Sequence, residues 1–202
     1  MLEYTIEQEL WNEGYELVCG VDEAGRGPLC GPVVAAAVIL PRGLYLEGLN
    51  DSKKISPKKR DKLFDLICES AIAYSIQQGS VEEINSTNIL EATMNAMRRA
   101  IVALEPKADF ALIDGNCTRG FKIPAEAIVK GDSKSMSIAA ASVLAKVTRD
   151  RFMLEMDEKY PEYQFAKHKG YGTKLHTDLI KEYGPSEIHR LSFLKNILGD
   201  KK

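Results

Sequence analysis

Residues 20–40 read GVDEAGRGPLCGPVVAAAVIL, and this stretch decides the fold. The apolar residues of 17–21 predict a short buried strand, and two adjacent acids, Asp22 and Glu23, follow it. Buried acids are costly unless something compensates their charge. The glycines and the arginine just beyond them let the backbone approach a large polar or anionic ligand closely. Residues 33–40 predict a second apolar strand. The stretch therefore predicts a carboxylate site for metal beside a phosphate-compatible loop.

The totals describe an ordinary globular chain. It has 202 residues, 45% of them hydrophobic and 28% charged, with a formal net charge of −2. This length and composition predict one domain over residues 1–202. Four scattered cysteines without a C-x-x-C pair favour reduced thiols in a cytosol. The first residues are unlike a secretory signal, and residues 33–40 are too short to span a bilayer. We therefore expect a cytoplasmic monomer with no membrane segment.

The rest of the chain alternates helix and strand patterns. Ser56-Pro57 predicts a helix start, and the apolar residues that follow have core-facing spacing: Leu63, Leu66, Ile67 and Ala71. Further strands are expected near residues 72–76, 108–113 and 127–129, and further helices over 86–104 and 135–156. A basic loop over 165–173 precedes a last helical region that extends to 198. This order predicts one mixed α/β domain.

Two more acids stand in suggestive places. Asp114 ends the strand FALID, and Asp132 lies in KGDSK before an Ala-rich helix. Strand ends and helix starts that meet at one edge of a sheet are common sites in α/β domains. Four close carboxylates would repel by roughly 4 kcal/mol per pair at about 4 Å, so they call for cations. Oxygen ligands favour Mg²⁺ or Mn²⁺, and two such ions suit phosphodiester hydrolysis. Turn chemistry for Asp114 and helix capping for Asp132 are the structural alternatives.

The basic segments offer a second, weaker signal. The lysine run at 53–62 is either a solvated helix face or a binding patch. Residues 165–176, FAKHKGYGTKLH, contain no acid, and Tyr171 there either stacks on a sugar or base or packs within its loop. The three histidines of the chain lack metal-ligand spacing, and we expect solvated or capping roles for His176 and His189.

Six motifs in register resemble one family, type 2 ribonuclease H (bacterial ribonuclease HII). They are GVDEAGRGPLCGPV at 20–33, DSKK at 51–54, LIDGN at 112–116, KGDSK at 130–134, SIAAASVLAKVTRDR at 137–151 and HKGYGT at 168–173. The resemblance implies a ribonuclease H-like fold, with a mixed five-stranded sheet flanked by helices and a helical C-terminal extension from about residue 160. It also implies cleavage of the RNA strand of RNA–DNA hybrids and incision 5′ to single ribonucleotides in duplex DNA, leaving 3′-hydroxyl and 5′-phosphate ends.

The resemblance also implies a role for individual residues. The acids carried over as catalytic, metal-binding groups for two Mn²⁺ or Mg²⁺ ions are Asp22, Glu23, Asp114 and Asp132. The family's loop that reads the ribonucleotide 2′-hydroxyl matches Gly25, Arg26 and Gly27, and its junction-checking tyrosine matches Tyr171. Contacts to phosphates, or support of the site, are carried over to Lys53, Ser133, Lys146 and Lys169. A 2′-hydroxyl both donates and accepts, and an exposed glycine-rich backbone can offer both capacities in return.

The sequence departs from the family pattern at two places. Cys30 stands where Ala is common, and we expect no functional effect from it. Residues 189–193 resemble the family's C-terminal HR-x-SF, whose implied DNA contact here has Leu191 where a basic residue is common. A catalytically silent nucleic-acid-binding module on the same fold is the main alternative function. A phosphotransfer enzyme for a small nucleotide is a third, but the chain has no G-x-x-x-x-G-K-[ST] loop.

Overall fold

The computed structural model describes residues 4–49, 52 and 55–199. Its centre is a five-stranded sheet in the order β3-β2-β1-β4-β5. The strands are β1 Val18–Ala24, β2 Val33–Ile39, β3 Ala73–Gly79, β4 Phe110–Asp114 and β5 Ala125–Ile128. β2 is antiparallel to both β1 and β3, whereas β1, β4 and β5 run parallel. The predicted mixed five-stranded sheet is therefore confirmed.

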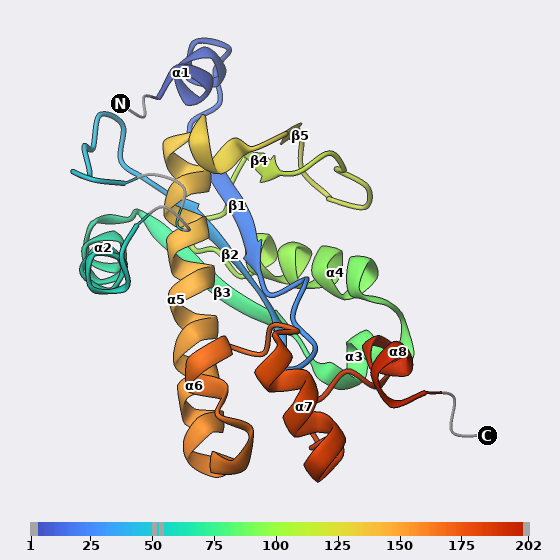
Figure 1. Cartoon of the computed structure of the whole chain (residues 1–202). Helices are drawn as coiled ribbons and strands as arrows, with labels where there is room; N and C mark the ends of the chain where they lie inside the picture. Colours follow the sequence, from blue (N-terminus) through green and yellow to red (C-terminus); the bar gives the residue numbers. More distant parts are fainter. Residues whose placement is uncertain (1–3, 50–51, 53–54, 200–202) are drawn as a thin grey trace.

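Helices cover both faces of this sheet. They are α1 Thr5–Asn12, α2 Pro57–Ser70, α3 Val81–Ser86, α4 Ile89–Val102, α5 Met136–Lys159, α6 Phe165–His168, α7 Lys174–Tyr183 and α8 Lys195–Leu198. Short 3-10 turns in the described residues accompany them: η1 Gly131–Ser133, η2 Pro161–Tyr163 and η3 Leu191–Phe193. Figure 1 shows α5 along one face with α2 beside it, and α4 across the other. The helical segments from η2 onward pack at one end.

β2 shows why this sheet must be covered twice. All seven of its residues are buried, and alternate side chains enter different cores. Val34 and Val38 pack with α2 and α5, while Ala35 and Ala37 pack with α4. Side chains alternate between the faces of a strand, so an unbroken apolar run requires a helical layer on each side.

The start of α5 is fixed against β1 and α1. A Cβ on Gly20 would lie 2.1 Å from the carbonyl carbon of Ser137, so only glycine permits this approach of helix to strand. The buried Glu7 carboxylate of α1 accepts hydrogen bonds from Ser135 Oγ at 2.6 Å and from the Ser137 amide at 3.0 Å. Ser135 in turn caps the helix by accepting from the Ile138 amide. These contacts fix the helix that borders the candidate site.

Several predicted elements have different boundaries in the structure. The predicted helix over 86–104 is α4, which begins only after Asn88 because the Asn88 side chain accepts from the Glu91 amide and caps the helix, and the separate helix α3 precedes it. Leu66 was expected in the core but is 47% exposed, since the buried face of α2 is formed by Leu63 and Ile67. The expected loop over 165–173 begins with the short helix α6.

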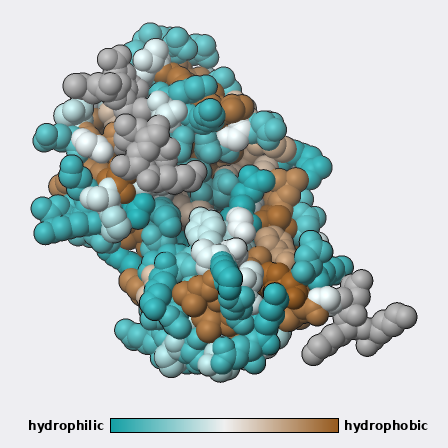
Figure 2. All heavy atoms as spheres, in the orientation of Figure 1, coloured by the Kyte–Doolittle hydropathy of each residue, from teal (hydrophilic) through white to brown (hydrophobic). Residues whose placement is uncertain are grey.

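The surface is mixed in character. Figure 2 shows the viewed face as mostly hydrophilic, with small separate hydrophobic patches. Within the described ranges, none of the helices combines the length and apolarity that crossing a membrane requires. All four cysteines are free thiols, and Cys19 and Cys30 are buried. The expected packed thiols are therefore confirmed for these two residues.

Candidate active site

The predicted acids gather at the ends of two parallel strands. Asp22 and Glu23 lie within β1 rather than after it, and Asp114 ends β4, whose Ile113 pairs with Val21. The Asp114 carboxylate accepts the Gly131 amide at 2.6 Å, which fixes η1 and its Asp132 beside the strand end. Asp22 is 5% exposed and Asp132 8%. Burial of two acids on neighbouring elements creates an electrostatic cost at this edge.

The pKa of Asp22 reflects the electrostatic cost of burying these acids. Burial raises the pKa of Asp22 well above its usual value, and the nearby charges of Glu23 and Asp114 raise it further. Hydrogen bonds donated by Ser142 and by the Glu23 amide oppose the shift. A cation at this edge would offset the repulsion, and the carboxylate oxygens are ligands that suit Mg²⁺ or Mn²⁺. The residues present therefore fit a divalent metal.

The carboxylates at this edge do not form a tight cluster of three in the described part of the chain. Among the described residues, no three of these acids have ligand oxygens within 4.8 Å of one another. The one group of described metal-type ligands that meets this spacing is Cys30, His176 and His189, away from the acids.

A cleft of about 190 Å³ opens beside these acids. Its lining includes Glu23, the Gly25-Arg26-Gly27 triplet (the Gly-Arg-Gly loop), Lys146 and Tyr171. A Cβ on Gly27 would lie 3.9 Å from Tyr171 Cε1, so the loop and the tyrosine face the same space. Tyr171 is 44% exposed, leaving its ring free to stack on a ligand. The structure thus brings the predicted loop and tyrosine together with Glu23.

Gly25 allows the loop to turn over a buried arginine. Its φ of +103° lies in the region that favours glycine. A Cβ there would lie 2.1 Å from Arg149 Nε. Arg149 is 1% exposed and donates to the carbonyls of Pro32, Cys30 and Lys169. The loop therefore rests on an interior guanidinium that also holds the chain next to Tyr171.

The residues predicted to contact phosphates or support the site lie in different places. Lys146 lines the cleft, and its Nζ donates to Asp150 Oδ1 at 2.6 Å. Lys169 lines a neighbouring cleft of about 450 Å³, and burial lowers the pKa of its amine. Ser133 is exposed, and its hydroxyl donates to the Lys130 carbonyl within the turn. Lys53 lies outside the described residues.

The solvated role predicted for His176 and His189 was wrong. His176 and His189 are 0% and 1% exposed, so neither is solvated. Their Nε2 atoms lie 3.1 Å apart, and the His176 ring stacks on His168 with centroids 4.1 Å apart. Arg190, also expected near DNA, is fully buried, whereas Leu191 is 58% exposed. Sequence spacing hid these contacts because the residues come from different elements.

Sequence reasoning also missed Ser142 and Arg149. Ser142 hydrogen-bonds Asp22, and its Oγ lies 2.9 Å from Ser52 Oγ. A signal was available, because Ser142, Lys146 and Arg149 follow one another at helical spacing. That spacing places them on the face of α5 that borders the cleft.

Comparison with known proteins shows the family of this chain. The family model described as Ribonuclease HII matches residues 19–196. The chain belongs to the ribonuclease HII family. It is 54% identical over 196 residues to the Ribonuclease HII of Caldicellulosiruptor bescii, covering 97% of this chain and 95% of that protein. The resemblance in the motifs is therefore confirmed, and the protein is a ribonuclease H enzyme, a metal-dependent nuclease of the hydrolase class.

Solved structures support the fold of this ribonuclease HII family member. The crystal structure of ribonuclease H2 from Pyrococcus horikoshii OT3 superposes with a TM-score of 0.74 at 28% identity, covering 91% of this chain and 97% of that one. Bst-RNase HIII in complex with Mn²⁺ has a TM-score of 0.63 at 18% identity, covering 85% and 64% of the two chains. The ribonuclease H-like fold expected from the sequence is confirmed.

Proposed function

We propose that this enzyme cleaves the RNA strand of RNA–DNA hybrids and incises duplex DNA 5′ to single embedded ribonucleotides. Products with 3′-hydroxyl and 5′-phosphate ends would serve ribonucleotide removal and repair. The enzyme would act as a cytoplasmic monomer and as one domain with a helical extension from about residue 160. The observation that carries the proposal is the position of the Gly-Arg-Gly loop and Tyr171 in one cleft with Glu23.

The acids would hold the metal. Asp22, Glu23, Asp114 and Asp132 supply oxygen ligands at one sheet edge, and the raised pKa of Asp22 shows the charge that cations would offset. Two divalent ions bound there would activate water and stabilise the leaving oxygen. The Mn²⁺ in the solved RNase HIII complex supports this class of ion for the fold.

The cleft would select the sugar rather than the base. The Gly-Arg-Gly loop presents backbone without a Cβ at two of its three positions, which suits contact with a 2′-hydroxyl. Tyr171 would stack on the following deoxyribose. Lys146 and Lys169 line adjoining clefts, where they would bind phosphates, and Ser133 and Lys53 would support the site. A site that hydrogen-bonds a substrate hydroxyl strongly rejects the analogue that lacks it.

The deciding experiment is cleavage of a labelled DNA duplex that carries one ribonucleotide. It is run with Mg²⁺, Mn²⁺ or chelator, beside an all-DNA duplex and a continuous RNA–DNA hybrid. We expect metal-dependent incision 5′ to the ribonucleotide and none in the all-DNA duplex. Asp22→Asn should abolish it, and Glu126→Gln, which changes an exposed acid on β5, should not.

Each unfavourable outcome has a definite meaning. Cleavage of the continuous hybrid without incision at a single ribonucleotide would remove the embedded-ribonucleotide activity from the proposal. Binding of both duplexes without cleavage under any metal would favour the silent binding module. Wild-type product formation by Asp22→Asn would refute the assignment of the acids.

A further inference from the structure

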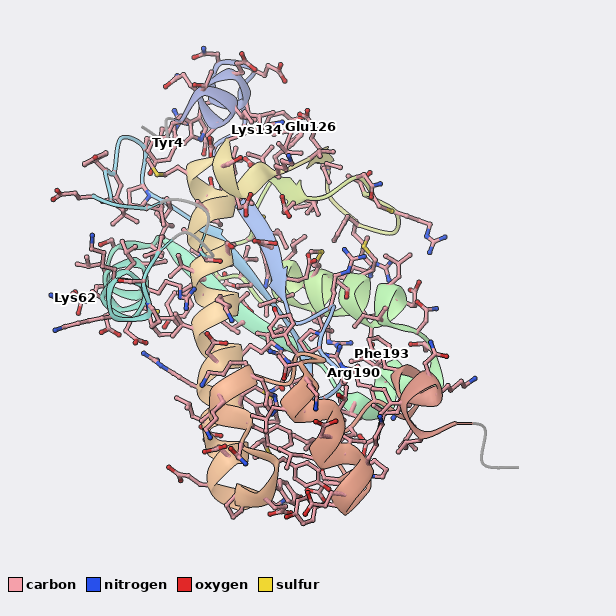
Figure 3. The ribbon with its side chains drawn as sticks, viewed as in Figure 1. Tyr4, Lys62, Glu126, Lys134, Arg190 and Phe193 are labelled. Atoms are coloured by element: carbon pink, nitrogen blue, oxygen red, sulfur yellow. The ribbon has the colours of Figure 1, made fainter. Side chains whose placement is uncertain are left out.

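The C-terminal pair His189-Arg190 lies inside the protein, directly behind the proposed substrate cleft. Figure 3 shows Arg190 beside Phe193, where the C-terminal segment meets the end of the sheet, and the guanidinium carbon lies 5.4 Å from that ring's centroid. Arg190 is 0% and His189 1% exposed. Side chains this deeply buried do not contact DNA. Their role must therefore follow from the hydrogen bonds that they form inside the protein.

Arg190 holds the carbonyls of the Gly-Arg-Gly loop. Its guanidinium donates to Gly25 O at 2.7 Å and Arg26 O at 3.1 Å. It also donates to Pro28 O and Gly31 O, each at 2.8 Å. Burial lowers the pKa of Arg190 to about 9, which keeps it charged at neutral pH. In the described part of the chain, its hydrogen-bond partners are backbone carbonyls alone. The charged guanidinium of Arg190 therefore serves to position the backbone of the loop.

This arrangement determines which way the loop amides point. In a trans peptide the C=O and the following N–H point in opposite directions. With the carbonyls of Gly25 and Arg26 turned inward to Arg190, the N–H groups of Arg26 and Gly27 point outward. Neither amide forms a hydrogen bond to another described residue. A cation bound to the carbonyls also polarises the same peptide units and makes these N–H groups stronger donors.

His189 acts on Tyr171 through a second histidine. The Ser186 amide donates to His189 Nδ1 at 2.9 Å, and because an amide can only donate, the proton of neutral His189 is on Nε2. His189 Nε2 therefore donates to His176 Nε2 at 3.1 Å. His176 must then carry its proton on Nδ1, which donates to the Tyr171 carbonyl at 3.0 Å. Three hydrogen bonds thus fix the backbone of Tyr171 to the segment at 186–189.

The same atoms do not form a metal site. Cys30, His176 and His189 meet the spacing for a metal ion, but the proton on His189 Nε2 blocks the lone pair a ligand would need. Burial also raises the pKa of the Cys30 thiol to about 12, so it stays protonated. The cluster is a hydrogen-bonded core.

We propose that His189 and Arg190 are positioning residues for ribonucleotide selection. Arg190 aims the Arg26 and Gly27 amides at the substrate sugar or its phosphate, and His189, through His176, fixes Tyr171. Backbone hydrogen bonds connect the Arg190 segment to the Tyr171 segment, because the Arg190 amide donates to Leu29 O and the Leu29 amide donates to Gly170 O. This inference rests on the proposed function of the cleft.

A double-mutant cycle tests whether His189 acts through Tyr171. The variants are His189→Leu, Tyr171→Ala and their combination, assayed as kcat/KM on the single-ribonucleotide duplex. We expect His189→Leu to lower kcat/KM roughly tenfold in the wild-type background, and to cause no further loss once Tyr171 is truncated. His189→Gln, which keeps a donor for His176, should recover part of the loss. Equal fold-losses in both backgrounds would refute action through Tyr171.

The role of Arg190 is tested by NMR of the loop amides together with cleavage activity. Arg190→Lys keeps the charge but cannot span four carbonyls. It should shift the amide proton resonances of Arg26 and Gly27 upfield and lower kcat/KM on the single-ribonucleotide duplex. Arg99→Lys is the matched control, since Arg99 Nη2 donates to the Gln78 carbonyl at 2.9 Å away from the cleft. Unchanged resonances and unchanged kcat/KM in Arg190→Lys would overturn the Arg190 role.

Failure of this inference differs from failure of the proposed function. If the wild-type enzyme does not incise at the single ribonucleotide, the proposed function fails. If it does, and His189→Leu and Arg190→Lys cleave as well as wild type, only the positioning roles fail. The His189 cycle does not depend on whether Arg190→Lys folds, and urea unfolding of every variant identifies losses due to unfolding.

Discussion

Lowering the pH tests the buried histidines, because burial lowers the pKa of both His176 and His189 from 6.5 to about 4. In the unfolded chain each accepts a proton near pH 6.5, and in the folded protein only near pH 4. Between these values the unfolded chain binds more protons, so the free energy of unfolding falls as the pH drops. The neighbouring ionisable groups, His168, Cys30 and Arg190, do not reverse this sign, because none of them carries a negative charge that would favour a proton on either ring. The Cys30 thiol stays protonated, and a charge on His168 lowers the pKa of both histidines.

The size of the effect follows from the two pKa values. At about 1.4 kcal/mol for each tenfold change in proton affinity, each histidine costs roughly 3 kcal/mol by pH 4. Two such losses are comparable with the whole stability of a typical domain, about 5–15 kcal/mol. His176 and His189 are 0% and 1% exposed, so solvent screening reduces the figure little. We therefore expect acid to destabilise the protein strongly below about pH 6.

The measurement is urea unfolding by far-UV circular dichroism from pH 7 to pH 4. A variant with both His176→Gln and His189→Gln is the comparison, because carboxylates titrate alike in both proteins and cancel in the difference. The variant should be less stable than wild type at pH 7 and should lose several kcal/mol less on acidification. Equal losses, within about 1 kcal/mol, would refute the reasoning that these rings are buried and neutral.

Other changes have equally definite expected results. Asp22→Asn should raise the melting temperature in chelator, by relieving repulsion, and should remove most of the stabilisation that Mn²⁺ gives wild type; a lower melting temperature would contradict this. Gly25→Ala should cost about 2 kcal/mol in urea and reduce cleavage, since its Cβ would meet Arg149, and unchanged stability would argue against the positive φ. Glu7→Ala should cost about 1–3 kcal/mol by leaving the Ser137 amide without its partner, and Glu7→Gln less; equal costs would show that the charge is essential. Binding to duplex should fall with salt at a slope of roughly −0.9 per neutralised phosphate, and a flat dependence would exclude the lysine-lined clefts as its surface.

The sequence predicted the sheet and its acids well because both depend on local patterns. The apolar run of β2 is buried on both sides, as its composition indicates. Asp22 and Asp114 follow apolar stretches in the sequence, and parallel pairing of β1 with β4 places them at one edge. Patterns of this kind survive folding because strand periodicity directly sets which residues are buried.

The interior of the site was not predictable in the same way. A buried arginine and a solvated arginine look alike in sequence, and Arg190 is bonded to carbonyls about 160 residues earlier in the chain. The histidine pair comes from α7 and the segment after it, so no single spacing reveals their contact. The prediction that Leu66 lies in the core failed because the buried face of α2 is narrower than the spacing of its apolar residues suggests.

The bond between Glu7 and the start of α5 has a consequence for synthesis of the protein. Glu7 and Ser135 are 128 residues apart, so the carboxylate leaves the ribosome long before its partners do. Until Ser135 and Ser137 are synthesised, the Glu7 carboxylate lacks the hydroxyl and amide donors that it binds in the folded protein. Asp132 emerges just ahead of these partners. The hydrogen bonds of Glu7 and the acidic edge are therefore both completed only late in the synthesis of the chain.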